Sequence, residues 1–138
     1  MILLELGSQG FYTEKQIKYV FYDIDDDYDT IEEGHVPALI GGRAGYLIIV
    51  DEKGNKEFIL FKGGYLEYDG ERLKVALRER LDPKKLDPQK LLEKVEELNQ
   101  KLLETEDEKE KRRLEEEILT TQKLYLALVK LNTYLENV

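Results

Sequence analysis

The sequence has no cysteine, one histidine (His35) and one serine (Ser8) among its 138 residues. Without cysteine the chain can form neither a disulfide framework, nor a thiolate metal site, nor a thiol nucleophile. One histidine and one serine leave little material for a Ser-His-Asp arrangement. These absences argue against the commonest nucleophilic enzymes and against disulfide-stabilised secreted domains.

Long hydrophobic runs and a basic surplus are also missing. The longest apolar run, Tyr46–Val50, suits a strand and is far shorter than the ~20 residues of a membrane span. The start, Met1–Glu5, has no basic region, so we expect no signal peptide. With 30 acidic and 21 basic side chains the net charge is −9, which argues against a generic nucleic-acid binder. We expect a soluble protein on the cytosolic side or at the periphery of a membrane.

Glycine and proline are absent from the last third of the sequence. All ten glycines lie at or before Gly70 and all three prolines at or before Pro88, which leaves 50 residues without either. Both residues interrupt helices, so this asymmetry predicts a turn-rich first part followed by a helical second part. We place the division at residues 1–84 and 85–138.

The first part alternates short apolar stretches with turn signals, of which Asp69-Gly70 is the strongest because it suits a type I′ hairpin turn. Gly41-Gly42 and Gly63-Gly64 are also interpreted as turns. Strands are predicted over six stretches: Ile2–Leu6, Ile17–Ile24, Gly45–Val50, Glu57–Lys62, Tyr65–Tyr68 and Leu73–Leu77. This spacing is typical of an antiparallel β-sandwich or barrel.

The second part predicts two helices, over about 88–104 and 106–136. Asp87-Pro88 is a strong start signal, with Asp as N-cap and Pro at the first helical position. Thr105 and Glu108 fit a capping box that would begin the second helix. We therefore expect an antiparallel helical hairpin after the β-sandwich. Because nothing in the polar stretch at 104–113 forbids helix, a single continuous helix is a second accessible state.

An acidic run packs seven carboxylates into the eleven residues 23–33. It does not fit a calcium loop of the EF-hand type, because Thr30 replaces the turn glycine and Val36 the bidentate glutamate. A solvated loop that faces a basic partner is the favoured interpretation. A looser cation site and a carboxylate-based hydrolase are the alternatives. The run consists of Asp23, Asp25, Asp26, Asp27, Asp29, Glu32 and Glu33.

Two further features allow a structural and a functional interpretation. His35, alone between Gly34 and Pro37, is expected to bond to the backbone in a turn rather than to bind a metal, with partner contact as the alternative. The stretch Leu124–Val129 is apolar nearly all round, more than a two-helix hairpin can cover. Its extra face packs either on the sandwich or on other subunits.

The order of parts and three short motifs resemble the epsilon subunit of the rotary F-type ATP synthase. Residues 33–39 are similar to the family's P-G-H-A-P-L turn, and Lys62–Glu67 to its S-G-G-x-L-E strand start. Gly10-Phe11-Tyr12 is similar to the early glycine and aromatic pair of the family. In architecture the resemblance spans nearly the whole chain.

The resemblance implies a non-catalytic subunit of the central rotor stalk, peripheral at the cytoplasmic face of a bacterial inner membrane. The sandwich would bind the gamma subunit, and the segment before Gly34 would face the membrane rotor ring. The helices would switch between a hairpin and an extended form that reaches the alpha and beta catalytic subunits and restrains ATP hydrolysis. The rival hypothesis is a free-standing β-sandwich and hairpin module that regulates another assembly.

The resemblance also suggests site residues. The ring-facing group is Asp27, Asp29, Ile31, Glu32 and His35, with the contact shifted to Asp27 or Asp29 because Tyr28 stands where the family has its acid. The conformational hinge is Glu104, Thr105, Glu106 and Asp107.

Regulatory ATP would bind through Leu86, Asp87 and Lys90, which match the family's I/L-D-x-x-R-A motif. Lysine replaces its arginine there, and lysine cannot form a bidentate fork to phosphate. No catalytic residue, metal or obligatory cofactor is expected.

Overall fold

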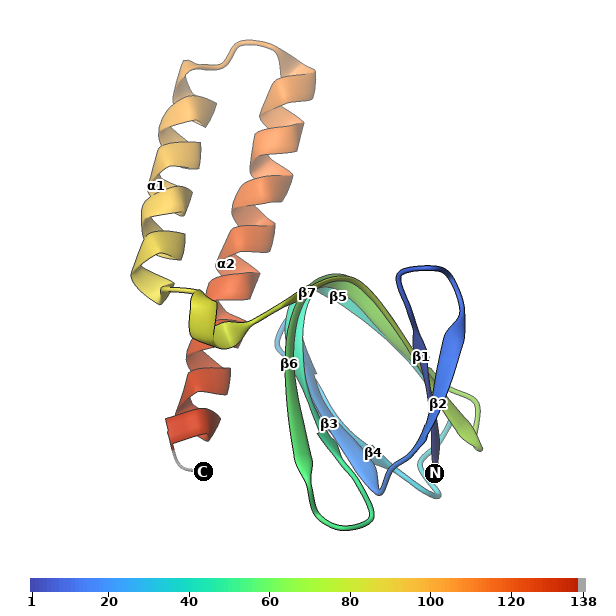
Figure 1. The fold of residues 1–138 in the computed structure, drawn as a ribbon. Coiled ribbons are helices and arrows are strands. Elements are labelled where there is room, and N and C mark those ends of the chain that lie inside the picture. Colours follow the sequence, from blue (N-terminus) through green and yellow to red (C-terminus); the bar gives the residue numbers. More distant parts are fainter. Residues whose placement is uncertain (137–138) are drawn as a thin grey trace.

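The computed structural model describes residues 1–136 and consists of a β-sheet followed by two helices (Figure 1). The expected fold class, a β-sandwich followed by a helical hairpin, is confirmed. The elements are β1 (Ile2–Leu6), β2 (Tyr12–Gln16), β3 (Tyr19–Ile24), β4 (Asp27–Glu32), β5 (Ala38–Val50), β6 (Lys56–Tyr68), β7 (Arg72–Leu81), a 3₁₀ turn (Pro83–Lys85), α1 (Pro88–Glu104) and α2 (Glu108–Glu136).

All seven strands belong to one coiled sheet in the order β2-β1-β7-β6-β5-β3-β4. Figure 1 shows the sheet curling so that β1 and β2 lie opposite β3 and β6 across an enclosed interior. Five of the six neighbouring pairs are antiparallel, as expected, but β1 runs parallel to β7. Parallel neighbours need a long connection, and five strands separate β1 from β7 along the chain.

The Gly-Gly pairs are not turns, which corrects the expectation from the sequence. Gly42 and Gly64 lie opposite each other within β5 and β6, strands of thirteen residues each. Before this point Ile40 faces the interior of the sheet, and beyond it Ala44 faces the outside. Gly63 adopts φ +67°, and a Cβ on Gly64 would lie 2.7 Å from the carbonyl oxygen of Ala76. The two strands bend here and exchange faces, as strands do at the corners of sandwiches.

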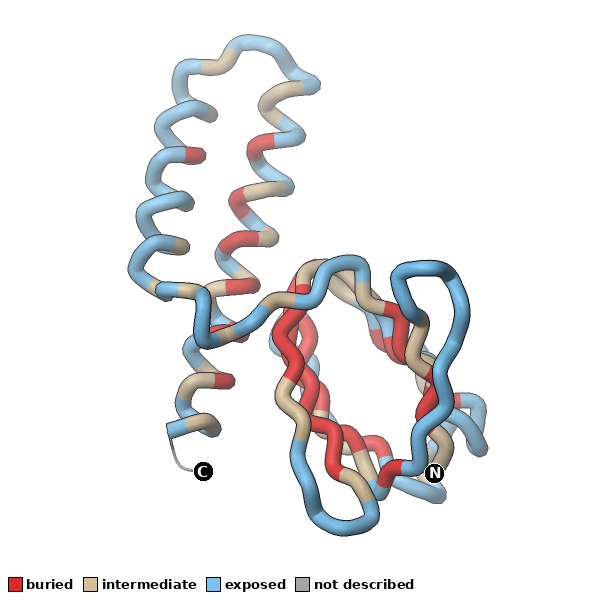
Figure 2. Tube along the Cα trace, in the orientation of Figure 1, coloured by how far each residue is buried: buried red, intermediate tan, exposed pale blue. Residues whose placement is uncertain are grey.

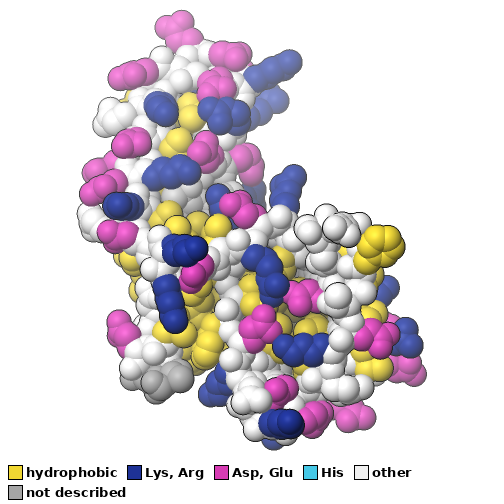
Figure 3. Space-filling model, in the orientation of Figure 1, with side chains coloured by type: hydrophobic (Ala, Val, Ile, Leu, Met, Phe, Trp, Pro, Cys, Tyr) yellow, Lys and Arg dark blue, Asp and Glu magenta, His cyan; other side chains and the backbone are white. Residues whose placement is uncertain are grey.

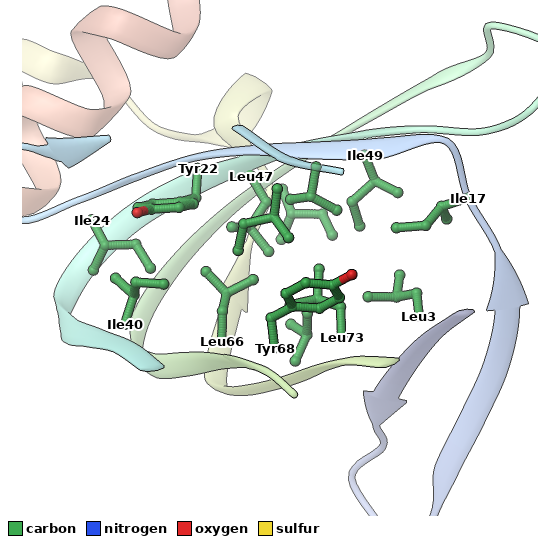
Figure 4. Close-up of a cluster of buried hydrophobic side chains, with 14 of the residues drawn as sticks. Leu3, Ile17, Tyr22, Ile24, Ile40, Leu47, Ile49, Leu66, Tyr68 and Leu73 are labelled. Carbon is green, nitrogen blue, oxygen red and sulfur yellow. The ribbon is translucent and has the colours of Figure 1, made fainter. Parts of the chain in front are cut away.

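Three hydrophobic clusters stabilise the molecule, and Figure 2 shows the buried positions along the strands and on α2. The first fills the interior of the sheet (Figure 4) and includes Leu3, Ile17, Leu47, Leu66 and Tyr68. The second lies between the outer face of the sheet and α2, and the third lies between α1 and α2. The buried members of the second cluster are Ala44, Tyr46, Ile48, Val50, Leu60, Leu124, Ala127, Leu128 and Leu131, and those of the third are Leu98, Leu114 and Ile118.

A side chain caps each end of α1: Asp87 at the N-terminus and Thr105 at the C-terminus. Asp87 accepts a hydrogen bond from the Gln89 N–H at 2.9 Å, and Pro88 occupies the first helical position. At the other end Thr105 is extended, and its hydroxyl donates to the carbonyl of Lys101. Thr105 therefore closes α1 instead of opening α2, so the predicted capping box is wrong. The second helix begins at Glu108, two residues later than expected.

Candidate functional site

The acidic run is not a loop but a β-hairpin formed by β3 and β4. Its turn residues, Asp25 and Asp26, have φ +50° and +69°. Aspartate is one of the few side chains that tolerate this left-handed conformation, which a tight two-residue hairpin requires. Because strand residues alternate between faces, the hairpin separates the seven carboxylates into groups with different neighbours.

Two of the carboxylates, Asp23 and Asp26, face α2. The Lys130 ammonium lies 2.7 Å from Asp26 Oδ1 and 3.1 Å from Asp23 Oδ2, and Lys123 lies 3.3 Å from Asp26 Oδ2. Hydrogen bonds from Lys130 and then Lys123 lower the pKa of Asp26, and the bond to Asp26 raises the pKa of Lys130. This part of the acidic run is therefore neutralised by the chain's own second helix.

Asp25 has a structural role at the corner of the sheet. Its carboxylate accepts hydrogen bonds from the backbone N–H of Arg43 at 3.1 Å and of Ala44 at 3.3 Å. Within residues 1–136 no three His, Asp or Glu side chains gather as they would around a metal ion. Since amides and ammonium groups engage Asp23, Asp25 and Asp26, their geometry gives no support to a cation site or a hydrolase.

Of the remaining carboxylates, Asp27, Asp29 and Glu32 lie along β4 at the edge of the sheet, and Glu33 is exposed in the turn that follows. Asp27, Asp29 and Glu32 are exposed, and Tyr28 between the first two is 66 % exposed. Ile31, which the sequence grouped with them, points into the interior and is fully buried. The exposed surface of β4, which we call the acidic edge, therefore consists of Asp27, Tyr28, Asp29 and Glu32.

His35 connects the acidic edge to the segment that leads into β5. Its Nε2 lies 3.3 Å from Asp29 Oδ2 and its Nδ1 lies 2.6 Å from the carbonyl oxygen of Val36. Both partners are acceptors, so only the doubly protonated ring can donate to both. The Val36 carbonyl and then Asp29 raise the pKa of His35, and the Thr30 N–H and then His35 lower the pKa of Asp29. The turn histidine thus has the expected bond to the backbone and, in addition, a carboxylate partner.

The three residues of the nucleotide motif do not form a common site. Leu86 packs against the cluster between the sheet and α2, and the Asp87 carboxylate caps α1. Lys90 is exposed on the first turn of α1. The structure therefore gives this motif a role in starting the helix.

The hinge residues lie at the tip of the hairpin, farthest from the sheet (Figure 1). Glu104 ends α1, and Thr105, Glu106 and Asp107 link it to α2. Glu104, Glu106 and Asp107 are exposed, while Thr105 is half-buried. No cluster of buried side chains holds this linker in place, since the nearest one, around Leu98 and Leu114, lies between the helices.

The apolar surface of α2 is divided between two environments. Leu124, Leu128 and Leu131 are buried against the sheet. This is the first of the two interpretations of the sequence, in which the extra apolar face of the helix packs on the sandwich. Leu126 and Val129, on the other side of the helix, are 41 % and 39 % exposed. Figure 3 shows hydrophobic side chains where the hairpin meets the sheet and charges of both signs along the hairpin.

A second exposed apolar surface, which the sequence analysis did not single out, lies on the sheet. Phe11 is 76 % exposed at the β1–β2 turn, and Leu39 on β5 is 72 % exposed. Tyr65 lines a surface hollow with Leu39, and the neighbouring Tyr12 raises the pKa of Tyr65. We call Phe11, Tyr12, Leu39 and Tyr65 the aromatic patch. Local sequence gave one signal, the adjacent aromatic pair after Gly10.

Neither α1 nor α2 is long and apolar enough to cross a bilayer, as judged over residues 1–136.

The fold is similar to that of chains in two mitochondrial ATP synthase complexes. One belongs to a cryo-EM structure of the Euglena gracilis enzyme comprising OSCP, F1 and the c-ring, with 19 % identity and a TM-score of 0.71 over 93 % of this chain and 81 % of that chain. Another belongs to the central stalk and c-ring of the Tetrahymena thermophila enzyme, with 11 % identity and a TM-score of 0.61 over 93 % of this chain and 96 % of that chain. No family model matches the sequence, and no curated protein matches it. The resemblance to an ATP synthase subunit, expected from the sequence, is thus found in the fold.

Proposed function

We propose that this chain is a central-stalk subunit of an F-type ATP synthase, of the epsilon type, and carries out no chemistry of its own. The observation that carries the proposal is the match of the entire arrangement, coiled sheet plus hairpin, to chains of two ATP synthase complexes over 93 % of the sequence. Fold alone does not determine function, so the proposal also depends on surfaces suited to the expected partners.

The gamma subunit is the proposed partner of the aromatic patch. Exposed Phe11, Leu39, Tyr12 and Tyr65 form an apolar surface that water solvates poorly. Aromatic side chains are also the residues that most often dominate the free energy of protein binding. The patch lies on the sheet, so a partner there leaves the helical hairpin accessible.

The membrane rotor ring is the proposed partner of the acidic edge. Asp27, Asp29 and Glu32 suit the basic ring loops that the sequence resemblance implies, and complementary charge orients such contacts. Asp23 and Asp26 are excluded because Lys130 occupies them. We therefore place the protein at the periphery of an energy-converting membrane. The bacterial inner membrane stays a prediction, since both similar structures are mitochondrial.

The hairpin is the proposed regulatory part. In the structure it is folded, and an extended form that reaches the alpha and beta subunits would open at residues 104–107. An inhibitory effect on ATP hydrolysis belongs to the same proposal. Two packings of similar free energy are what such a switch needs.

Binding to the cognate gamma subunit tests the proposal. We expect micromolar or tighter affinity by titration calorimetry, and a tenfold or greater loss for Phe11→Ser or Leu39→Ser because each removes an exposed apolar anchor. Leu103→Ser is the matched control, since Leu103 is 80 % exposed at the tip of the hairpin and should not matter. A wild-type chain that does not bind gamma at micromolar concentration contradicts the proposal and favours the free-standing module.

A further inference from the structure

The docking of α2 on the sheet depends on one ammonium group, that of Lys130. We propose that Lys130, Asp23 and Asp26 form an electrostatic clamp without which α2 cannot stay on the sheet. Lys130 contacts both aspartates, and Lys123, about two helical turns earlier on α2, adds a second contact to Asp26. The clamp joins segments about one hundred residues apart in sequence, with Lys130 lying 107 positions from Asp23 and 104 from Asp26.

The lysines are placed for this role by the period of the helix. Lys123 and Lys130 are seven residues apart, which is close to two helical turns, so both lie on one face of α2. Leu124, Leu128 and Leu131, which are buried against the outer side of the sheet, lie on the neighbouring face, about 100° further round the helix. The charges and the apolar contacts therefore engage the sheet together.

The receiving carboxylates belong to a turn that is held by contacts with β5 and not only by α2. Asp25, between them, accepts two backbone hydrogen bonds from β5, and the turn residues already adopt the left-handed conformation. The β-hairpin lies so close to β5 that a Cβ on Gly42 would stand 2.6 Å from Ile24 Cγ2. A preorganised acceptor loses little conformational entropy on binding, which favours a strong and specific contact.

Burial distinguishes this clamp from the other ion pair between α2 and the sheet. Arg43 and Glu116 lie 2.8 Å apart, but their side chains are 39 % and 65 % exposed, so water can replace either partner. The Asp23 side chain is only 8 % exposed beneath α2, while its partner Lys130 is 39 % exposed, as Arg43 is, so burial sets the carboxylate apart and not the ammonium. Removing the cation from a buried carboxylate strongly destabilises the folded protein, whereas removing both partners can leave its stability nearly unchanged. Loss of Lys130 therefore leaves the buried Asp23 carboxylate without its cation while α2 is docked, which disfavours docking.

A consequence for partners follows from the same contacts. While α2 is docked, the chain's own aspartates occupy Lys123 and Lys130, which withholds both charges from any acidic protein surface.

Distance measurements between engineered spin labels test the clamp. Because the chain has no native cysteine, labels at Glu52→Cys on the β5–β6 turn and Glu136→Cys at the end of α2 report only the docking distance. In the isolated full chain we expect one short distance. Lys130→Gln should lower the ratio of docked to undocked molecules at least tenfold, while Asp23→Asn combined with Lys130→Gln should restore most of it.

Lys109→Gln is the matched control, since Lys109 is exposed on the part of α2 that lies beyond the sheet. Rescue in the double variant would show that the unpaired Asp23 carboxylate is what drives α2 off the sheet. Unchanged distances in Lys130→Gln overturn the proposal, as does a double variant as open as the single one. The test needs no partner protein, so its failure and a failure of gamma binding are distinguishable.

Discussion

At the scale of single residues, His35 is the group whose charge state affects the acidic edge most directly. Both ring nitrogens face acceptors, Asp29 Oδ2 and the Val36 carbonyl oxygen, and the pKa of His35 is raised above 6.5. The stabilising contribution of a raised pKa is fully present below the unfolded value and is lost as pH rises through the folded one. The segment between β4 and β5 is therefore held more firmly at mildly acidic pH than at alkaline pH.

Replacing the carboxylate partner should shift this titration. We expect Asp29→Asn to lower the pKa of His35, but not below its usual range, because the Val36 carbonyl, the larger cause of the shift, remains. NMR titration of the ring protons measures the pKa of His35 directly, since the sequence has one histidine and its signals need no assignment. Asp27→Asn is the control, because Asp27 is not among the groups that shift the pKa of His35. Equal His35 titrations in wild type and Asp29→Asn would rule out the contact.

The candidate site could be predicted only where its partners are near in sequence. The turn position of His35 and the cap formed by Asp87 both follow from residues within a few positions, and the structure has both. Which aspartates remain exposed was not predictable, because Lys130 comes from a helix more than one hundred residues away. Ile31 could not be assigned to the interior until the run was known to be a strand.

At the scale of elements, the corner in β5 and β6 determines where the sheet bends. Glycine pairs have the same local signal for a turn and for a corner, so three short strands were predicted where two long ones run. The difference depends on pairing between distant segments: Gly42 opposite Gly64, and Gly64 opposite Leu77 of β7. Helix limits were easier to predict, since caps and proline act locally.

The corner has a measurable requirement for glycine. We expect Gly64→Ala to lower the free energy of unfolding by about 2 kcal/mol, because its Cβ would meet the Ala76 carbonyl and Leu77 Cδ2 at 2.7 and 2.9 Å. Gly41→Ala is a matched control on the neighbouring strand, with ordinary contacts of 3.4 and 3.5 Å. Urea unfolding of both variants measures the difference. If the two variants were equally stable, the close approach at the corner would not be the reason for Gly64.

At the scale of the whole molecule, α2 is part of the sheet's second hydrophobic core rather than an appendage. It covers Tyr46, Ile48 and Leu60 on the outer face, all of which are nearly fully buried. The sequence indicated that α2 had more apolar surface than a hairpin can bury, but not which surface would receive it. That surface exists only because β5 and β6 exchange faces at their corner.

Removing the helices should therefore expose an apolar face. We expect a chain that ends after residue 86 to self-associate at micromolar concentration, because the outer face loses its cover. Sedimentation velocity measures this against the full chain. Ile48→Lys in the truncated chain should reduce the association, since it puts a charge in the uncovered face. A truncated chain that stays monomeric at the same concentrations would contradict the role given to α2.

The parallel pairing of β1 with β7 bears on how the chain folds as it is synthesised. Ile2 lies opposite Arg72, 70 positions later, so β1 leaves the ribosome on the order of ten seconds before its second neighbour exists. Until then β1 has only β2, and an isolated hairpin is marginally stable in water. The sheet must close late, after the non-local contacts that slow folding have formed. During that interval Leu3, completely buried in the finished protein, is the kind of side chain a chaperone binds.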